Sequence, residues 1–179
     1  MLWTEKYRPS KLSEVLGQEP FVMDAEHWVI NKDCPNLLLY GMAGTGKTGA
    51  AVALANGILG DDAKSNFFEI NASDDRRLET VRTKVKSIAQ NSSYGDVPFR
   101  IVLLDEMGGM TTDAQNALKR LMERYASNIR FIITCNDRNK IIHALQSRCA
   151  NYHFKSLNLD VVESAIISIL NAEGIPVPS

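Results

Sequence analysis

The sequence is poor in cysteine, and its few cysteines are not spaced as a disulfide framework or a zinc site. Cys34, Cys135 and Cys149 are odd in number, far apart and outside any C-x-x-C pair. We therefore expect buried free thiols. The chain also lacks an apolar run of about 18 residues, and charges stand among its first residues where a signal peptide would be apolar. These absences predict an intracellular protein without membrane contact.

An excess of charge of either sign is absent too. The 20 Lys and Arg residues nearly balance the 21 Asp and Glu residues. A wholly basic surface is thereby excluded, so any contact with nucleic acid must be confined to a local patch. With 179 residues the chain is about the size of one domain and can bury a core without a structural metal.

Residues 41–48 read Gly-Met-Ala-Gly-Thr-Gly-Lys-Thr, which is a complete phosphate-loop pattern. The apolar run 37–40 before it and the small residues 49–55 after it predict a strand, a loop and a helix. Glycines let the loop amides surround an anion at the helix N-terminus. Lys47 is expected to reach the β- and γ-phosphates, and the Thr48 hydroxyl to bind Mg²⁺. The expected nucleotide contacts are Met42, Ala43, Gly44, Thr45, Gly46, Lys47 and Thr48.

Short apolar runs alternate with longer segments of helical periodicity, which is typical of an α/β fold with a parallel sheet. The expected strands are 37–40, 67–70, 101–104, 131–135 and 152–154, and the expected helices include 47–59, 78–90 and 112–125. The pattern predicts a five-stranded parallel sheet flanked by helices. Ligands of such sheets bind beyond the carboxyl ends of the strands.

Apolar residues from Val161 to Leu170 form a stripe on a predicted helix that Gly174 closes. We divide the chain into a nucleotide-binding domain, 1–156, and the first helix of a truncated helical lid, 157–179. The stripe needs a partner surface. It could instead pack back on the sheet or on another chain, and this point stays open.

Two carboxylates, Asp105 and Glu106, follow the apolar strand 101–104, as in the Walker B pattern that accompanies a phosphate loop in ATPases. Asp105 is expected to hold Mg²⁺, and Glu106 to orient and deprotonate the attacking water. Asn136 ends another strand, where its amide could bond the γ-phosphate or the water. An ordinary Asx turn before Asp137 is the alternative for Asn136.

The chain resembles the replication factor C small subunits, the sliding-clamp loaders of the AAA+ class in archaea and eukaryotes. The resemblance rests on the phosphate loop and on further motifs along nearly the whole chain: 3–9, 15–18, Asn71-Ala72-Ser73-Asp74, Asp105-Glu106, 113–118, Asn136 and Ser147-Arg148-Cys149. It implies an Mg²⁺-dependent ATPase that loads a clamp on primed DNA. The implied partners are other clamp-loader subunits in a ring, the sliding clamp and the phosphate backbone of primer-template DNA.

The resemblance also implies roles for residues that spacing alone does not assign. Arg148 would act in trans, as an arginine finger on the γ-phosphate of a neighbouring subunit. Arg82 and Lys86, four apart on one helix, would face DNA, although a basic helix face is more often simply solvated. The segments implied to pack on the adenine contain Tyr7, Arg8, Pro9, Val15, Leu16 and Gln18.

The chain departs from the family pattern at two places. Met42 and Ala43 replace two prolines in the loop, which should leave nucleotide binding intact. After Glu106 the chain reads Met107-Gly108-Gly109 where the family continues Ala-Asp, and the two glycines are expected to slow catalysis. A second sensor arginine of the family would lie beyond Ser179, so we expect very weak hydrolysis by the isolated chain. The alternatives are a scaffold subunit that holds ATP without turnover and a small-molecule kinase, for which no acceptor-binding segment is found. The protein would be cytoplasmic in an archaeal or viral source and nuclear in a eukaryote.

Overall fold

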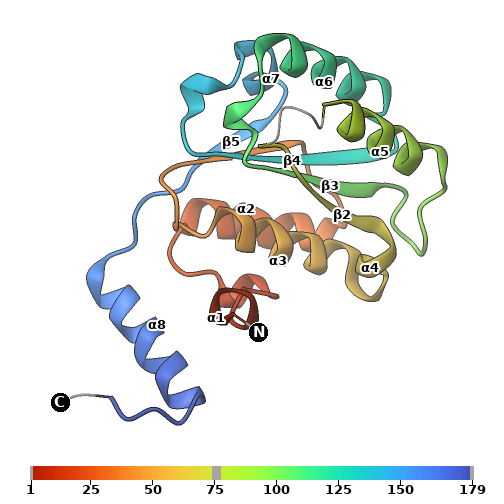
Figure 1. Ribbon diagram of the computed structural model, residues 1–179. Coiled ribbons are helices and arrows are strands. Elements are labelled where there is room, and N and C mark those ends of the chain that lie inside the picture. Colours follow the sequence, from red (N-terminus) through yellow and green to blue (C-terminus); the bar gives the residue numbers. More distant parts are fainter. Residues whose placement is uncertain (1, 74–77, 178–179) are drawn as a thin grey trace.

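A five-stranded parallel sheet lies at the centre of the computed structural model, which describes residues 2–73 and 78–177 (Figure 1). The strand order is β2-β3-β4-β1-β5, and every strand pair is parallel. The strands are β1 (Leu37–Tyr40), β2 (Phe67–Asn71), β3 (Arg100–Asp105), β4 (Ile129–Cys135) and β5 (Ala150–His153). The predicted α/β sheet is therefore confirmed, although β5 begins at Ala150 rather than at Tyr152.

Helices cover both faces of the sheet, which makes a three-layer molecule (Figure 1). One face carries α2 (Glu19–Asn31), α3 (Lys47–Leu59) and the short α4 (Ala63–Asn66), and the other carries α5 (Leu78–Gln90), α6 (Thr112–Arg124) and α7 (His143–Gln146). The predicted α6 start is confirmed, because the Thr111 side chain accepts a hydrogen bond from the Ala114 amide. In contrast, α2 is absent from the predicted helices, although Pro20 in its first turn is a typical start signal.

The strands form the common wall of two apolar cores. Alternate residues of β1 point to opposite faces: Leu38 packs with α5 and α6, whereas Leu37 and Leu39 pack with α2 and α3. All three are fully buried. Burial on both faces explains why these strands read as continuous apolar runs rather than as alternating patterns.

The remaining helices are short or lie apart from the sheet. Short 3-10 turns occupy Leu12–Glu14, Gly60–Asp62, Met107–Gly109 and Arg138–Lys140, and α1 covers Trp3–Lys6. The last helix, α8 (Leu159–Ala172), extends away from the three layers (Figure 1). No residue of Leu159–Ala172 is buried. A groove between this helix and the N-terminal segment is lined by Leu16 and by α8 residues from Asp160 to Ser168. The division into 1–156 and 157–179 stays a prediction.

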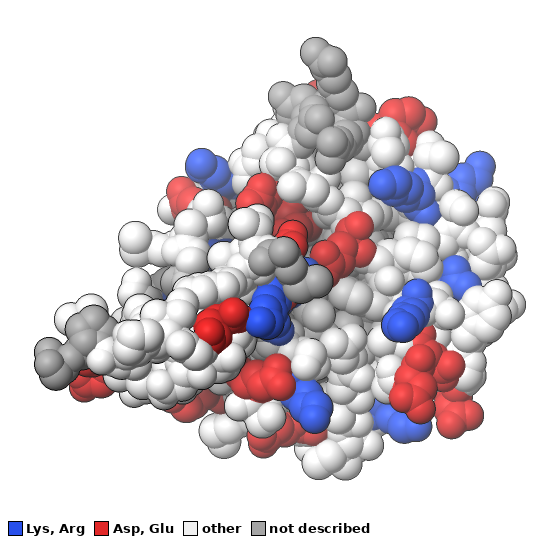
Figure 2. Space-filling model, turned by 60° about the horizontal axis from the view of Figure 1, so that its bottom comes forward, with Lys and Arg blue, Asp and Glu red and all other residues white. Residues whose placement is uncertain are grey.

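The surface carries both charges without separating them. On the face turned forward in Figure 2, acidic and basic side chains are interspersed, which agrees with the near-zero net charge. Among the described helices, none combines the length and the apolarity that crossing a bilayer requires.

Gly41, the first residue of the phosphate loop, lies against the end of β5 and has a φ of 148°. A Cβ at this position would lie 2.1 Å from the Phe154 carbonyl oxygen, which is a backbone atom that cannot turn aside. Gly44 has a φ of 78° but open space around the position of a Cβ. Substitution of Gly41 by alanine therefore combines a backbone clash with a positive φ. Substitution of Gly44 involves the positive φ alone.

We expect Gly41→Ala to lower the free energy of unfolding by about 3 kcal/mol or more, because the clash adds to backbone strain. Gly44→Ala should cost only about 1 kcal/mol, from strain alone. Urea denaturation followed by circular dichroism measures both values. Equal losses for the two variants would contradict the close approach of Gly41 to Phe154.

Candidate functional site

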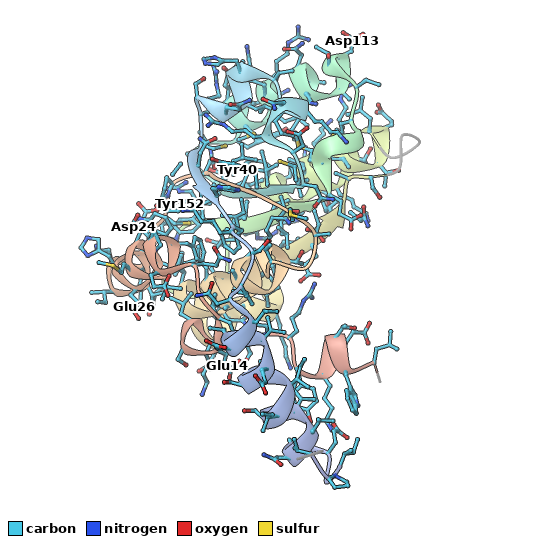
Figure 3. The ribbon with its side chains drawn as sticks, turned by 90° about the vertical axis from the view of Figure 1, so that its left-hand side faces the viewer. Glu14, Asp24, Glu26, Tyr40, Asp113 and Tyr152 are labelled. Atoms are coloured by element: carbon cyan, nitrogen blue, oxygen red, sulfur yellow. The ribbon has the colours of Figure 1, made fainter. Side chains whose placement is uncertain are left out.

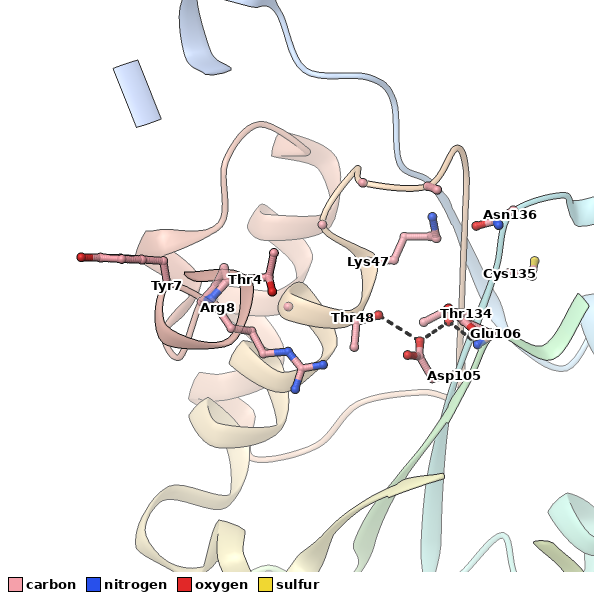
Figure 4. A pocket seen from close by; sticks show the side chains of 15 residues that line it. Thr4, Tyr7, Arg8, Lys47, Thr48, Asp105, Glu106, Thr134, Cys135 and Asn136 are labelled. Carbon is pink, nitrogen blue, oxygen red and sulfur yellow. Dashed lines mark hydrogen bonds between the residues drawn. The ribbon is translucent and has the colours of Figure 1, made fainter. Parts of the chain in front are cut away.

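A cleft of about 450 Å³ opens at the carboxyl ends of the central strands (Figure 4). Its walls come from the phosphate loop and α3, from the ends of β3 and β4, and from the N-terminal segment. Because β1, β3 and β4 are parallel neighbours, the residues that follow them meet at one edge of the sheet. The structure thus brings Lys47, Thr48, Asp105, Glu106 and Asn136 together around a single cavity.

The phosphate loop runs directly into the N-terminus of α3. Gly46 caps this helix with a φ of 91°, and its first residue is Lys47. The Lys47 Nζ donates to the carbonyl oxygens of Gly41 and Met42, both at 2.7 Å. Burial lowers the pKa of Lys47, while the nearby carboxylates of Asp105 and Glu106 oppose this effect. A cationic amine and a helix N-terminus therefore face the same cavity, which is an environment for a polyanion.

Asp105 is hydrogen-bonded to two hydroxyl groups. Its Oδ1 accepts from Thr48 Oγ1 at 2.9 Å and from Thr134 Oγ1 at 2.5 Å (Figure 4). The Thr48 hydroxyl and the Asp105 carboxylate are oxygen donors of the kind that Mg²⁺ prefers. In the described part of the chain, no group of three or more His, Cys, Asp or Glu side chains could hold a metal by itself. The oxygen pair fits Mg²⁺, which commonly takes one or two protein oxygens and completes its shell with phosphates and water.

Glu106 has an exposed side chain on a left-handed backbone with a φ of 57°. Its amide donates to Thr134 Oγ1 at 3.0 Å, which holds this uncommon conformation. The Cβ position of Gly108 is 3.5 Å from the nearest side-chain atom and that of Gly109 is 3.7 Å from the nearest backbone atom, which are ordinary contacts. Neither glycine is therefore required by crowding.

Cys135 also lines the cleft, between Thr134 and Asn136. Burial raises the pKa of its thiol to about 11, so the sulfur is protonated at neutral pH and is not a nucleophile. The prediction of buried free thiols is confirmed for Cys34 and Cys135, whereas Cys149 is half-buried.

The N-terminal segment contributes Thr4, Tyr7, Arg8 and Pro9 to the wall opposite the strands. Arg8 is held by an ion pair with Glu69 of β2 at 3.1 Å. The Tyr7 ring points away from the phosphate loop (Figure 4). That Tyr7, Arg8 and Pro9 contact adenine stays a prediction.

Other residues of the predicted nucleotide set have different surroundings. Val15 packs at the margin of the core with α2 and α3, and Leu16 lies in the groove on α8. Gln18 bridges backbone groups: its Nε2 donates to Lys155 O at 2.8 Å, and its Oε1 accepts from Lys155 N at 3.1 Å. Met42 is largely exposed and Thr45 is buried, with the Thr45 hydroxyl donating to the Met42 carbonyl at 2.8 Å. Contacts of these side chains with a nucleotide stay predictions.

The predicted trans and DNA residues belong to other surfaces. Arg148 donates to the Ala144 carbonyl at 3.0 Å and forms an ion pair with Glu123 of α6. Arg82 and Lys86 are on the exposed side of α5, where Arg82 pairs with Glu79. Asp74, from one of the motifs, lies outside the described residues.

The sequence assigned no site role to four residues that the structure brings to the cleft: Thr4, Gly49, Thr134 and Cys135. Thr134 is 2% exposed and joins Asp105 to the Glu106 amide through one hydroxyl. The one sequence feature that could have indicated a role for Thr134 is its polar side chain within the apolar strand β4. Its partners could not be read from the sequence because they follow another strand.

We expect Thr134→Val to lower the free energy of unfolding by about 1–3 kcal/mol, because the isosteric change leaves the Glu106 amide without its acceptor. Thr134→Ser keeps the hydroxyl and should lose much less. Chemical denaturation of both variants measures the difference. If valine is tolerated as well as serine, the hydroxyl does not hold the end of β3.

Comparisons with known proteins agree with this geometry. A family model described as "ATPase family associated with various cellular activities (AAA)" matches residues 37–157. The replication factor C small subunit of Archaeoglobus fulgidus is 42% identical over 176 residues, which cover 98% of this chain and 55% of that relative. The replication factor C small subunit of Methanococcus maripaludis is 47% identical over 163 residues, covering 90% of this chain and 52% of that relative. The chain spans about half the length of these curated relatives.

Among solved structures, RuvB of Thermotoga maritima, a Holliday junction branch migration motor, superposes with a TM-score of 0.77. The match covers 96% of this chain and 56% of that chain at 15% identity. At this identity, the likeness concerns the fold alone.

Proposed function

Because this chain belongs to the AAA ATPases and, among them, to the replication factor C small subunits, we propose that it is an ATP-binding subunit of a sliding-clamp loader. In this proposal, ATP binding and hydrolysis are coupled to loading the clamp on primed DNA. The observation that supports it best is the complete phosphate loop facing Asp105 across one cleft. Its archaeal relatives favour a cytoplasmic protein.

Each part of the cleft has a task in this proposal. The loop amides and Lys47 bind the β- and γ-phosphates of ATP, which requires the Lys47 amine to leave the carbonyls of Gly41 and Met42. Thr48 and Asp105 would hold Mg²⁺, which when bound neutralises phosphate charge. The arm residues from Thr4 to Pro9 would close the adenine side of the cleft.

For hydrolysis, Glu106 would accept a proton from the water that attacks the γ-phosphorus, while the bond to the bridging oxygen of ADP breaks. The exposed carboxylate at the cleft is consistent with access to water. Asn136 would orient the same water or the γ-phosphate. Arg148 is on another surface, which favours its use on a neighbouring subunit's nucleotide.

The proposed partners follow from the family. They are companion subunits in a ring, the sliding clamp, and primer-template DNA. Arg82 and Lys86 would contact phosphates without reading bases, so binding to DNA should weaken with salt.

We expect this chain to bind ATP with Mg²⁺ and Lys47→Ala to weaken binding at least about 10-fold, because the amine is the cation closest to the loop. Glu106→Gln should keep the affinity. Calorimetry on the chain measures both, with circular dichroism as the control for folding. If the folded wild-type chain has no affinity for ATP and Mg²⁺, the proposed function is wrong.

Turnover separates this function from a second candidate, a scaffold that holds ATP without hydrolysis, which the Gly108-Gly109 sequence favours. In the assembly of full-length subunits with clamp and primed DNA, Glu106→Gln should lower DNA-stimulated turnover by about 10²-fold or more. Unchanged turnover would favour the scaffold.

The trans role of Arg148 has its own test. In rings of defined order, we expect Arg148→Ala subunits and Lys47→Ala subunits to be inactive separately and active when they alternate. Each intact ATP site then faces a neighbour that supplies Arg148. Arg124→Ala, an exposed change on α6, is the control. Inactivity of the alternating rings would contradict the trans role.

A further inference from the structure

The N-terminal arm, defined as residues 2–18, contributes to the nucleotide cleft and also reaches α8, and its short helix α1 lies beside α8 (Figures 1 and 3). One side of the arm lines the cleft through Thr4, Tyr7, Arg8 and Pro9. The helix α1 within it buries none of its residues Trp3–Lys6. Because α1 has no buried residue, its position depends on discrete contacts.

One carboxylate on the far side of the arm provides such contacts. Glu173, at the end of α8, accepts hydrogen bonds from Lys6 Nζ at 2.5 Å and from the Tyr7 hydroxyl at 2.6 Å, both on Oε1. The two donors come from adjacent residues that are more than 160 positions away in the sequence. These bonds join the last turn of α8 to the arm.

The charges of the three groups are suited to this arrangement. The hydrogen bonds from Lys6 and Tyr7 lower the pKa of Glu173, so the carboxylate is ionised at neutral pH. The bond to Glu173 raises the pKa of Lys6 and that of Tyr7, so both donors keep their protons. A charged acceptor with two donors forms stronger hydrogen bonds than neutral groups do.

One of the two donors to Glu173 is also a residue of the nucleotide cleft. Tyr7 lines the cleft while its hydroxyl reaches Glu173, and Arg8, the next residue, is held from the other side by Glu69. Pro9 then packs on Gly49 of α3, where a Cβ would lie 2.9 Å from the proline ring. Residues 7–9 of the cleft wall are therefore held by contacts with β2 and α3 at one end and with α8 at the other.

We propose that Glu173 is a positioning residue for the nucleotide site, which holds the arm in its binding conformation through Lys6 and Tyr7. The inference rests on the proposed ATP binding and adds a means of regulating it. When Glu173 is in place, the arm is already ordered, so ATP binding does not bear the cost of ordering it. By linkage, anything that moves α8 away lowers ATP affinity, and bound ATP favours the docked α8.

Trp3 on α1 is a built-in reporter of the arm. It is 44% exposed. The second tryptophan, Trp28 of α2, packs edge-on against Phe21 and Tyr152, so phenylalanine is the replacement that keeps an aromatic ring there. In a Trp28→Phe background, we expect Glu173→Ala to lower Trp3 fluorescence anisotropy without nucleotide present, because α1 loses its anchor. The same variant should weaken ATP·Mg²⁺ binding roughly 3- to 10-fold by calorimetry.

Three further variants sharpen the test. Glu163→Gln, an exposed change on the same helix, should leave anisotropy and affinity unchanged. Glu173→Gln keeps an acceptor but loses the charge, so its effect should be smaller than that of alanine. The double variant Lys6→Ala/Glu173→Ala should behave like Glu173→Ala alone, because both changes remove the same contact.

The outcomes distinguish this inference from the proposed function. Wild-type affinity in Glu173→Ala, tighter binding, or fully additive effects with Lys6→Ala would overturn the positioning role and leave the proposed function intact. If the wild-type chain binds no ATP, both proposals fall, whatever the anisotropy shows. Circular dichroism of each variant verifies that the sheet domain is folded.

Discussion

The parallel alignment of β1, β3 and β4 is the constraint on which the site depends. It brings the loop after β1 and the carboxylates after β3 to the same edge, where Thr48 donates to Asp105 at 2.9 Å. The pairing is stable because both sheet faces are covered and the strands are apolar on both sides. Polar chemistry is confined to the strand ends, where the backbone leaves the sheet and side chains reach the cleft.

The cleft combines rigid and adjustable walls. Lys47 begins a helix with a largely buried face, and Asp105 and Thr134 lie at or next to the ends of buried strands. Lys47 donates to the Gly41 carbonyl at 2.7 Å, and Thr134 donates to Asp105 at 2.5 Å. The opposite wall is the N-terminal arm, whose α1 has no buried residue. In the proposed function, the phosphates would need the preorganised donors of the rigid wall, and the arm would relay occupancy of the cleft to α8.

Motifs predicted the phosphate loop, Asp105, Glu106 and Asn136 because each follows an apolar run and carries its chemistry in local spacing. Thr134 was missed because its two partners belong to another strand end, and the bond to Glu173 because its donors are at the opposite end of the chain. The helix α2 was missed as well, although Pro20 stands in its first turn. The contacts of Thr134 and Glu173 join residues far apart in the sequence, so no periodic pattern in the sequence predicts them.

The sequence by itself determined the fold class, the position of the phosphate loop and the absence of a disulfide framework, because periodicity and spacing are local properties of the chain. Only the tertiary structure decided which hydroxyl holds Asp105, that Gln18 bonds the Lys155 backbone, and that Glu173 joins α8 to Tyr7. These contacts join segments that are far apart in the sequence. Which of them pack together depends on how the chain as a whole buries its apolar surface.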